Sequence, residues 1–261
     1  MESTHSQPGT AVFDLSGKTA LITGGGTGLG LQFARTLGGA GARLLLAGRR
    51  EAVLREACEG LSAGGIEAQP LPMNVADEAS VRGAFKALRE LTPEILVNNA
   101  GTAAHGRLEE IPVKVWDRVE GVNVRGAWLT GCAFVELHKA TADTAVIVNV
   151  ASVLGNSVQK GTGPYPTSKA ALLQLTRHMA VEWARYGVRV NALLPGYYRT
   201  DMAAAYLDSD AGQALLQKIP QRRVGEPADL HGPILLLASE ASRYMTGAAI
   251  TVDGGLSIPL V

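Results

Sequence analysis

Residues 23–30 read Thr23-Gly24-Gly25-Gly26-Thr27-Gly28-Leu29-Gly30, between a short apolar run that ends at Thr23 and an amphipathic pattern that begins at Leu31. In such a stretch Gly24 can make the sharp turn out of a strand, and Gly28 lets the backbone approach a pyrophosphate. Gly30 permits close packing of a helix on a strand. Free amides at the start of a helix attract phosphate. The stretch therefore predicts a dinucleotide-binding turn between the first strand and the first helix.

On both sides of this turn, short apolar runs alternate with longer amphipathic patterns. Strands that are apolar on both faces are typical of a buried parallel sheet, and helices between them cover its two sides. We predict an α/β fold, a Rossmann-like doubly wound seven-stranded parallel sheet with helices on both faces in a single domain. The predicted strands are 19–23, 43–47, 66–73, 95–98, 145–150, 188–193 and 249–252.

Two segments stand outside this alternation. The polar start of the chain lacks a cationic segment followed by an apolar one, so we expect a flexible tail at 1–14 and one domain over 15–261. An irregular stretch follows the sixth strand at its carboxyl end, where ligands of open parallel sheets bind. We predict a substrate lid at about 196–220. Its apolar residues indicate either a partly hydrophobic substrate or simple packing of the lid; they are Ala203, Ala204, Ala205, Tyr206, Leu207, Leu215 and Leu216.

Composition narrows the class of partner. Lys plus Arg number 24 and Asp plus Glu number 24, so the chain has no strong field of one sign to attract nucleic acid or an anionic membrane. Cys58 and Cys132 belong to no CxxC pair, and the five histidines lack metal-ligand spacing. We expect a cytoplasmic protein with a small-molecule partner and no metal.

The end of the second strand bears on the choice of cofactor. NAD enzymes usually place an acid there to hold the ribose hydroxyls, whereas NADP enzymes place a cation near the added phosphate. This chain reads Ala47-Gly48-Arg49-Arg50. Arg49 therefore favours NADP(H), with NAD(H) still possible, because Thr27 adds no second cation in the glycine-rich turn. The alternative is a solvated arginine pair that begins the next helix.

The reacting groups come after the fifth strand. Ser152 follows that strand, and Lys169 lies four residues after Tyr165, about one helical turn away. We expect the ammonium to favour the phenolate and to lower the pKa of the phenol, so that Tyr165 acts as the acid/base on an oxygen that Ser152 also holds. The flanking Pro164 and Pro166 predict that Tyr165 lies at the helix cap rather than within the first turn. The alternative is a surface pair beside a turn-capping serine.

Taken in order, these motifs resemble the short-chain dehydrogenase/reductase family, in its single-domain branch, over about residues 15–256. The motifs are TGGGTGLG at 23–30, NNAG at 98–101, Asn123 in VNV, Ser152 in VNVAS, YPTSK at 165–169 and PGYYRT at 195–200. The resemblance implies an NADP(H)-preferring oxidoreductase that interconverts a ketone or aldehyde and an alcohol by hydride transfer. It also implies a homodimer or homotetramer that pairs the helices at about 112–139 and 165–186.

The resemblance further implies a catalytic tetrad of Asn123, Ser152, Tyr165 and Lys169, in which Asn123 supports a water-mediated proton path to Lys169. Asn98 and Gly101 would brace the central strand. Asn74 stands where the family usually has an aspartate that accepts from adenine, and an amide oxygen can accept the same bond. The implied cofactor-binding residues are Gly24, Thr27, Gly28, Leu29, Gly30, Arg49, Asn74, Val75, Asn99, Ala100, Gly101, Tyr165, Lys169, Pro195, Gly196 and Thr200.

Two other functions stay open at this point. One is an NAD-dependent dehydrogenase of a sugar acid or secondary alcohol, and the other is a non-catalytic, dinucleotide-sensing regulator that shares the fold. The substrate classes compatible with the sequence are 3-oxoacyl thioesters, sugar-acid ketones, cyclic ketones and steroid-like ketones.

Overall fold

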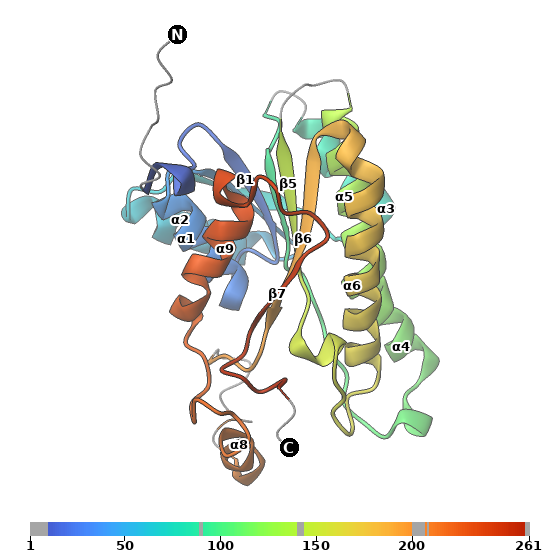
Figure 1. The fold of residues 1–261 in the computed structure, drawn as a ribbon. Helices are drawn as coiled ribbons and strands as arrows, with labels where there is room; N and C mark the ends of the chain where they lie inside the picture. The colour runs from blue at the N-terminus through green and yellow to red at the C-terminus, as the bar shows by residue number, and fades with distance from the viewer. Residues whose placement is uncertain (1–9, 89–90, 140–143, 200–206, 208, 259–261) are drawn as a thin grey trace.

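The computed structural model describes residues 10–88, 91–139, 144–199, 207 and 209–258. At its centre is a seven-stranded sheet in the order β3-β2-β1-β4-β5-β6-β7 (Figure 1). Every neighbouring pair is parallel, which confirms the predicted fold class. The strands are β1 Thr19–Thr23, β2 Arg43–Gly48, β3 Ala68–Pro72, β4 Ile95–Asn98, β5 Ala145–Val150, β6 Val188–Pro195 and β7 Ala249–Val252.

The strand order reverses between β1 and β4, because β2 and β3 continue outward from β1 on one side while β4 to β7 continue on the other. In open sheets of this kind, ligands bind outside the carboxyl ends of the strands at the point of reversal. Three strands differ from the prediction, and β2 differs only in running one residue further, to Gly48. β3 is shorter than 66–73 and lies at the edge, where Pro70 and Pro72 lose no ladder bond, and β6 runs on to Pro195.

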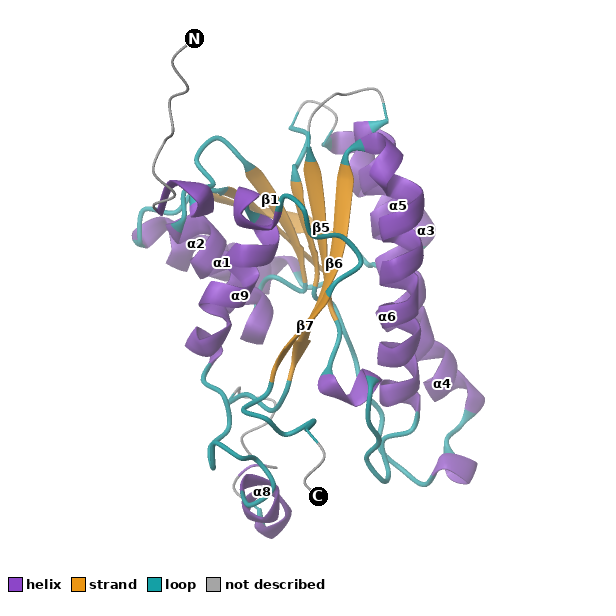
Figure 2. Ribbon diagram, in the orientation of Figure 1, coloured by secondary structure: helices purple, strands orange, loops and turns teal. Residues whose placement is uncertain are grey.

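Helices cover both faces of the sheet (Figure 2). Buried side chains of α1, α2 and α9 pack on one face, and those of α3, α5 and α6 pack on the other. α4 lies beside α6, and α8 lies beyond the carboxyl ends of the strands (Figure 1). The bounds are α1 Gly28–Gly39, α2 Glu51–Ala63, α3 Glu78–Ala87, α4 Val113–Glu120, α5 Gly126–His138, α6 Pro164–Trp183, α8 Asp210–Leu216 and α9 His231–Ala238.

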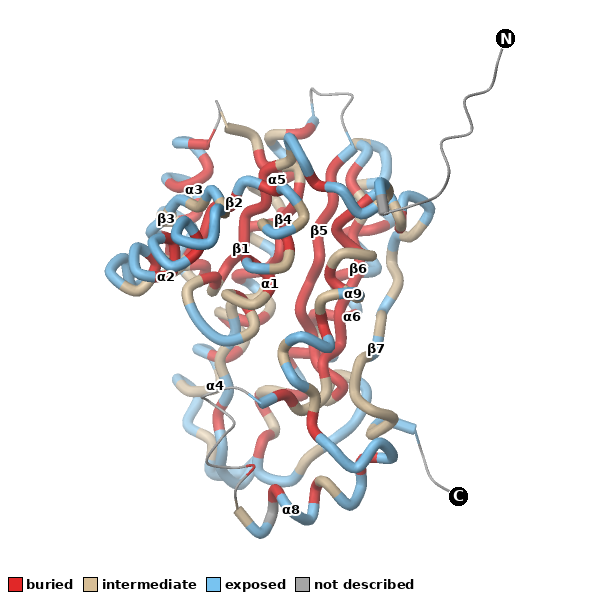
Figure 3. Tube along the Cα trace, turned by 90° about the vertical axis from the view of Figure 1, so that its left-hand side faces the viewer, coloured by how far each residue is buried: buried red, intermediate tan, exposed pale blue. Residues whose placement is uncertain are grey.

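The core therefore has two layers, with fully buried Phe33 of α1 in one and Phe134 of α5 in the other. The central strands are buried along their length (Figure 3). On α6, Leu172 and Met179 are buried while Leu175 and Trp183 pack against the core from its margin. This is the apolar stripe that the three- and four-residue spacing indicates. Among the described residues, no helix combines the length and apolarity needed to cross a membrane.

Two of the expected irregular segments contain regular structure. Within the 1–14 tail, residues 1–9 lie outside the described residues, but Thr10–Phe13 forms a short 3-10 helix. Within the 196–220 lid, residues 200–206 and 208 lie outside the described residues, but Asp210–Leu216 forms α8. The hydroxyl of Ser209 accepts a hydrogen bond from the Gly212 amide and so caps this helix, which explains why it begins there.

Candidate functional site

The glycine-rich turn has the backbone conformation that the sequence predicts. Gly24 and Gly28 have φ values of +65° and +54°, which strongly favour glycine. A Cβ atom on Gly30 would lie 2.2 Å from the carbonyl oxygen of Gly24. The first turn of α1 can therefore approach the end of β1 only because residue 30 has no side chain.

The start of α1 is suited to bind an anion. Thr27 is the N-cap residue in extended conformation, and its side chain makes no capping hydrogen bond. The amides of Gly28, Leu29 and Gly30, which cannot bond within the helix, are thus left for a ligand. They lie where the strand order reverses, which is the position of a dinucleotide pyrophosphate in such folds.

The residue before these glycines, Thr23, fixes β1 to the segment after β4. Its hydroxyl oxygen accepts hydrogen bonds from the amides of Asn99 and Ala100, both at 3.0 Å. The side-chain amide of Asn99 donates back to the carbonyl oxygens of Thr23 and Gly24, at 3.0 and 3.3 Å. Sequence reasoning missed Thr23, although a threonine at the last position of a strand before a glycine turn was a usable signal.

A buried polar network lies below the site. Asn98 donates to the amide oxygen of Asn149 at 2.9 Å and accepts from the Thr130 hydroxyl at 2.7 Å. Asn149 in turn donates to the Thr176 hydroxyl at 2.9 Å. These bonds join β4, β5, α5 and α6, so the brace expected of Asn98 is present, together with partners that sequence reasoning did not find.

The outer end of the dinucleotide crevice carries Arg49 and Asn74. Arg49 is exposed directly after β2 and forms no ion pair within the described part of the chain. The side-chain oxygen of Asn74 accepts from the Ala76 amide at 3.2 Å, which leaves it one further lone pair for an adenine amino group. Val75 beside it is buried. The residues present therefore fit an adenosine moiety that carries an additional phosphate.

The three predicted reacting groups meet at the carboxyl end of β5. Ser152 is 7% exposed, and its hydroxyl lies near enough to the Tyr165 hydroxyl to lower the pKa of that phenol. The Lys169 ammonium lies 5.5 Å from the centre of the Tyr165 ring and donates to the carbonyl oxygen of Val150 at 2.7 Å. The surface-pair alternative is wrong, because Lys169 is buried rather than solvated.

Tyr165 occupies a different helix position from the one predicted. α6 begins at Pro164 with Gly163 as its N-cap, so Tyr165 lies within the first turn and not at the cap. The first four amides of a helix have no partner inside it, so Pro164 and Pro166 cost no hydrogen bond at these positions. Proline thus starts the helix here without displacing the tyrosine from it.

The expected lowering of the phenol pKa is also wrong for the free protein. Burial raises the pKa of Tyr165, and the neighbouring Ser152 hydroxyl offsets this only in part. Burial lowers the pKa of Lys169 to about 8. The ammonium faces the ring and donates to Val150, so its attraction for a phenolate does not outweigh the burial of that phenolate. The phenol is therefore protonated near neutral pH and ready to donate to a carbonyl oxygen.

Asn123 lies in a π-helical turn, Gly121–Arg125, between α4 and α5. Its oxygen accepts from the Thr102 amide at 2.8 Å, and its nitrogen donates to the Thr102 carbonyl and the Ser168 hydroxyl, both at 2.9 Å. A Cβ atom on Gly101 would lie 3.6 Å from the Asn123 oxygen and 3.8 Å from the Lys169 nitrogen. The space left by Gly101 therefore borders both side chains.

The end of β6 forms the remaining wall of the site. The Gly196 amide donates to the carbonyl oxygen of Val252 at 2.9 Å, and a Cβ atom on Gly196 would lie 2.7 Å from Cβ of Asp253. Pro195 is buried beside it. Thr200, which the sequence assigned to the cofactor, lies outside the described residues.

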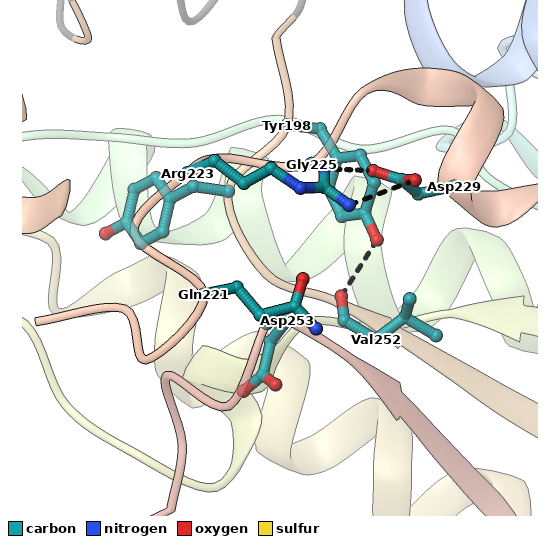
Figure 4. A pocket seen from close by; sticks show the side chains of 9 residues that line it. Tyr198, Gln221, Arg223, Gly225, Asp229, Val252 and Asp253 are labelled. Carbon is teal, nitrogen blue, oxygen red and sulfur yellow. Dashed lines mark hydrogen bonds and ion pairs between the residues drawn. The ribbon is translucent and has the colours of Figure 1, made fainter.

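A separate cavity of about 220 Å³ lies behind this wall (Figure 4). There the Tyr198 hydroxyl donates to the Val252 carbonyl at 2.9 Å, and Arg223 forms an ion pair with Asp229 at 2.5 Å. The main polar groups of the cavity are therefore bonded to one another. These bonds stabilise the ends of β6 and β7, and the residues that line the cavity include none of Ser152, Tyr165 and Lys169.

Comparison with known proteins gives close matches over almost the whole chain. Residues 24–257 match the model of a family described as enoyl-(acyl carrier protein) reductase. Gluconate 5-dehydrogenase of Gluconobacter oxydans is 35% identical, over 95% of this chain and 98% of that protein. Galactitol 2-dehydrogenase (L-tagatose-forming) of Cereibacter sphaeroides is 38% identical, over the same two shares.

A solved structure agrees with these sequence matches. The crystal structure of a gluconate 5-dehydrogenase from Burkholderia cenocepacia, in complex with NADP and tartrate, superposes with a TM-score of 0.92 at 33% identity. The match covers 95% of this chain and 98% of that one.

Proposed function

The chain belongs to the short-chain dehydrogenase/reductase family, and from this premise we propose that it interconverts a ketone and an alcohol of the sugar-acid or polyol kind with NADP(H). Membership makes the chain an oxidoreductase that acts on C–OH and C=O groups with a nicotinamide cofactor, as the sequence predicts. The alternative of a non-catalytic regulator has no support. The observation that carries the proposal is the meeting of Ser152, Tyr165 and buried Lys169 at the end of β5.

The substrate class is proposed from the relatives and from the packing of the chain. The two relatives compared above are named for gluconate and galactitol. Leu207 and Leu215 are buried in a cluster with Ile219 and Val224, so these apolar side chains pack the segment around α8 down. These leucines therefore give no evidence of a partly hydrophobic ketone, and Ala203, Ala204, Ala205 and Tyr206, on which that interpretation also rests, lie outside the described residues.

The proposed cofactor site uses the groups that the structure leaves free. The amides of Gly28, Leu29 and Gly30 bind the pyrophosphate, and Arg49 binds the additional phosphate by a charge-assisted pair. Asn74 and Val75 border the adenine. Asn99, Ala100, Gly101, Pro195 and Gly196 would border the nicotinamide half of the bound cofactor, whose chemistry would be hydride exchange with the substrate carbon.

The chemistry then rests on the residues after β5. In reduction, Ser152 and Tyr165 donate hydrogen bonds to the carbonyl oxygen, and Tyr165 transfers its proton as negative charge develops there. Oriented donors stabilise that charge more than they stabilise the neutral ketone. Lys169 holds positive charge behind the phenol, and Asn123 fixes the backbone of Thr102 beside the space left by Gly101. Oxidation reverses these steps.

A panel of carbonyl compounds tests the proposal, with NADPH oxidation as the readout. We expect turnover of sugar-acid ketones or ketoses, and we expect Tyr165→Phe to lower kcat by about 10²–10⁴ with little change in NADPH affinity. Tyr186→Phe is the matched control, because Tyr186 lies at the opposite end of α6, before β6. Equal activity in wild type and Tyr165→Phe would exclude Tyr165 as the acid/base.

We also propose that the segment around α8, Ser209–Val224, covers the substrate, because it follows β6 at the end of the sheet where Tyr165 lies. Its buried cluster would hold it in place over a bound substrate. Hydrogen exchange in α8 that slows when NADPH and substrate are added together would support this role.

A dimer or tetramer is proposed on the face formed by α4, α5 and α6. There Trp128 is 47% exposed, and one carboxylate oxygen of Glu120 is buried without a partner among the described residues. Both border a hollow that Val124, Arg125 and Leu175 also line. Light scattering of wild type and of Trp128→Glu tests this, and a monomeric wild type would refute it.

A further inference from the structure

A hydrogen bond joins two segments that carry different parts of the site. The hydroxyl of Tyr197 donates to the side-chain oxygen of Gln159 at 2.9 Å, across 38 residues of sequence. Tyr197 comes directly after Gly196 at the end of β6, and Gln159 lies on the loop between Ser152 and Tyr165. Since β5 and β6 pair in register up to Val150 and Leu193, the bond spans the ends of two adjacent strands.

From Gln159, two further hydrogen bonds lead to the catalytic tyrosine. The Thr162 hydroxyl donates to the backbone carbonyl of Gln159 at 2.9 Å. The Tyr165 amide donates to the backbone carbonyl of Thr162, also at 2.9 Å. Thr162 is buried, so a displacement of Gln159 is passed on to the first turn of α6.

From Tyr197, contacts lead to the segment around α8. Its carbonyl oxygen accepts from the Gly225 amide at 2.9 Å. Its ring packs on the cluster of Leu207, Leu215, Ile219 and Val224. The backbone of Tyr197 is therefore fixed by Gly225 and its ring by the apolar cluster. Its hydroxyl makes the contact with the loop that contains Gln159.

That loop has few apolar anchors of its own. Asn156, Ser157 and Val158 are exposed, the last of them at 93%. Gly161 accepts a backbone bond from Gly106, which ties the loop to the segment after β4. The Tyr197 hydroxyl supplies the tie to the other side, next to β6.

From these contacts we infer that Tyr197 and Gln159 are positioning residues for carbonyl reduction: their hydrogen bond couples the segment around α8 to the loop that sets the position of the Tyr165 hydroxyl. The inference rests on the proposed function. Neither residue exchanges a proton with the substrate. Because Tyr197 is packed against the cluster of this segment, the bond holds the start of α6 in the geometry that proton transfer requires.

A double-mutant cycle on carbonyl reduction tests the coupling. Tyr197→Phe keeps the ring in its cluster and removes only the hydroxyl, and Gln159→Leu removes the accepting oxygen together with the amide nitrogen. We expect each variant to lower kcat about fivefold, the typical effect of one lost neutral hydrogen bond, with unchanged NADPH affinity. The double variant should be no slower than either single variant. Losses that multiply would overturn the inference, because they would show two independent effects.

A conservative change sharpens the cycle. Gln159→Glu keeps an oxygen acceptor, so with an uncharged ketose as substrate it should retain wild-type kcat. When Gln159→Glu is combined with Tyr197→Phe, kcat should be about fivefold lower than in wild type, as in Tyr197→Phe alone. Tyr186→Phe, at the opposite end of α6, should leave kcat unchanged and shows that the effect is not general to tyrosine removal.

Hydrogen exchange separates this inference from the proposed function, because it needs no turnover. In Tyr197→Phe the peptide that contains the Tyr165 amide should exchange about fivefold faster than in wild type, whereas peptides of α2 should not change. If wild type reduces no carbonyl compound, the proposed function fails and the exchange result alone decides the coupling. Unchanged exchange at Tyr165 would overturn it.

Discussion

The turn after β1 and the loop and helix after β5 build the two halves of the site by opposite means. In the turn, the proposed cofactor site depends on atoms that are absent, since a Cβ on Gly30 would collide with the Gly24 carbonyl oxygen. After β5, the proposed chemistry depends on side chains that are present and buried, Ser152 and Lys169. Backbone sterics can be predicted from glycine positions, whereas the protonation of a buried group depends on its final surroundings. The two halves should therefore respond differently to substitution.

The largest effect is expected at Lys169. Lys169→Met keeps the length of the buried side chain and removes its charge and its bond to Val150. We expect kcat for carbonyl reduction to fall by about 10²–10⁴, since the phenol loses the cation that stabilises it after proton transfer. Steady-state kinetics check this, with exposed Lys86 of α3 changed to Met as the control. A loss below tenfold would show that Tyr165 works without the cation.

The same residue gives a pH dependence of stability. The pKa of Lys169 is about 8 in the folded chain, and an unperturbed lysine has 10.5. Between these values the unfolded chain binds more protons than the folded chain, so the free energy of unfolding rises with pH from about 8 to 10.5. Burial of the charged ammonium destabilises the folded chain by about 3 kcal/mol, and this destabilisation is fully present below pH 8.

Urea unfolding of wild type and Lys169→Met at pH 7 and pH 9.5 measures this cost. The difference in unfolding free energy between the two proteins should shift by about 2 kcal/mol in favour of wild type at the higher pH. A difference that stays constant with pH would contradict the assigned burial of the ammonium.

In the glycine-rich turn, the corresponding test adds an atom instead of removing a charge. A Cβ at position 30 would meet the Gly24 oxygen at 2.2 Å and the Asn99 side chain at 2.6 Å, and neither can move freely. We expect Gly30→Ala to destabilise the protein by about 1–3 kcal/mol and to weaken NADPH binding. Thermal unfolding and fluorescence titration measure the two effects.

Gly39, at the other end of the same helix, is the matched control. A Cβ there meets nothing within 4 Å. Gly39→Ala should leave NADPH binding unchanged and raise stability by up to about 1 kcal/mol, because alanine favours the helix. Similar losses in the two variants would mean that the close approach of α1 to β1 is not what makes Gly30 necessary.

The sequence predicts the sheet well because each strand is a short apolar run, and β1, β4, β5 and β7 begin and end where expected. It also predicts which three groups meet after β5. It does not predict the direction of the Tyr165 pKa shift, since burial of the ring and the orientation of Lys169 arise from packing. The partners of Asn98 escape prediction for the same reason, because Thr130 and Asn149 are brought to it from other elements.

The smallest effect is expected at the outer end of the dinucleotide crevice, where Arg49 is exposed to solvent. If Arg49 binds the additional phosphate of NADP(H), Arg49→Ala should raise the KM for NADPH about tenfold and leave the KM for NADH unchanged. Because the pair is solvated, the difference should shrink as salt is raised from about 0.1 to 1 M.

Arg50, the next residue and equally exposed, is the control for a general loss of positive charge. It is the N-cap residue of α2 and its side chain makes no capping hydrogen bond, so its removal should change neither KM by more than about twofold. If Arg50→Ala and Arg49→Ala raise the NADPH KM equally, the preference comes from the field of both cations rather than from one contact. The region of Arg49 and Arg50 would then differ from the glycine-rich turn, since neither the backbone conformation nor a single side chain would decide between NADPH and NADH.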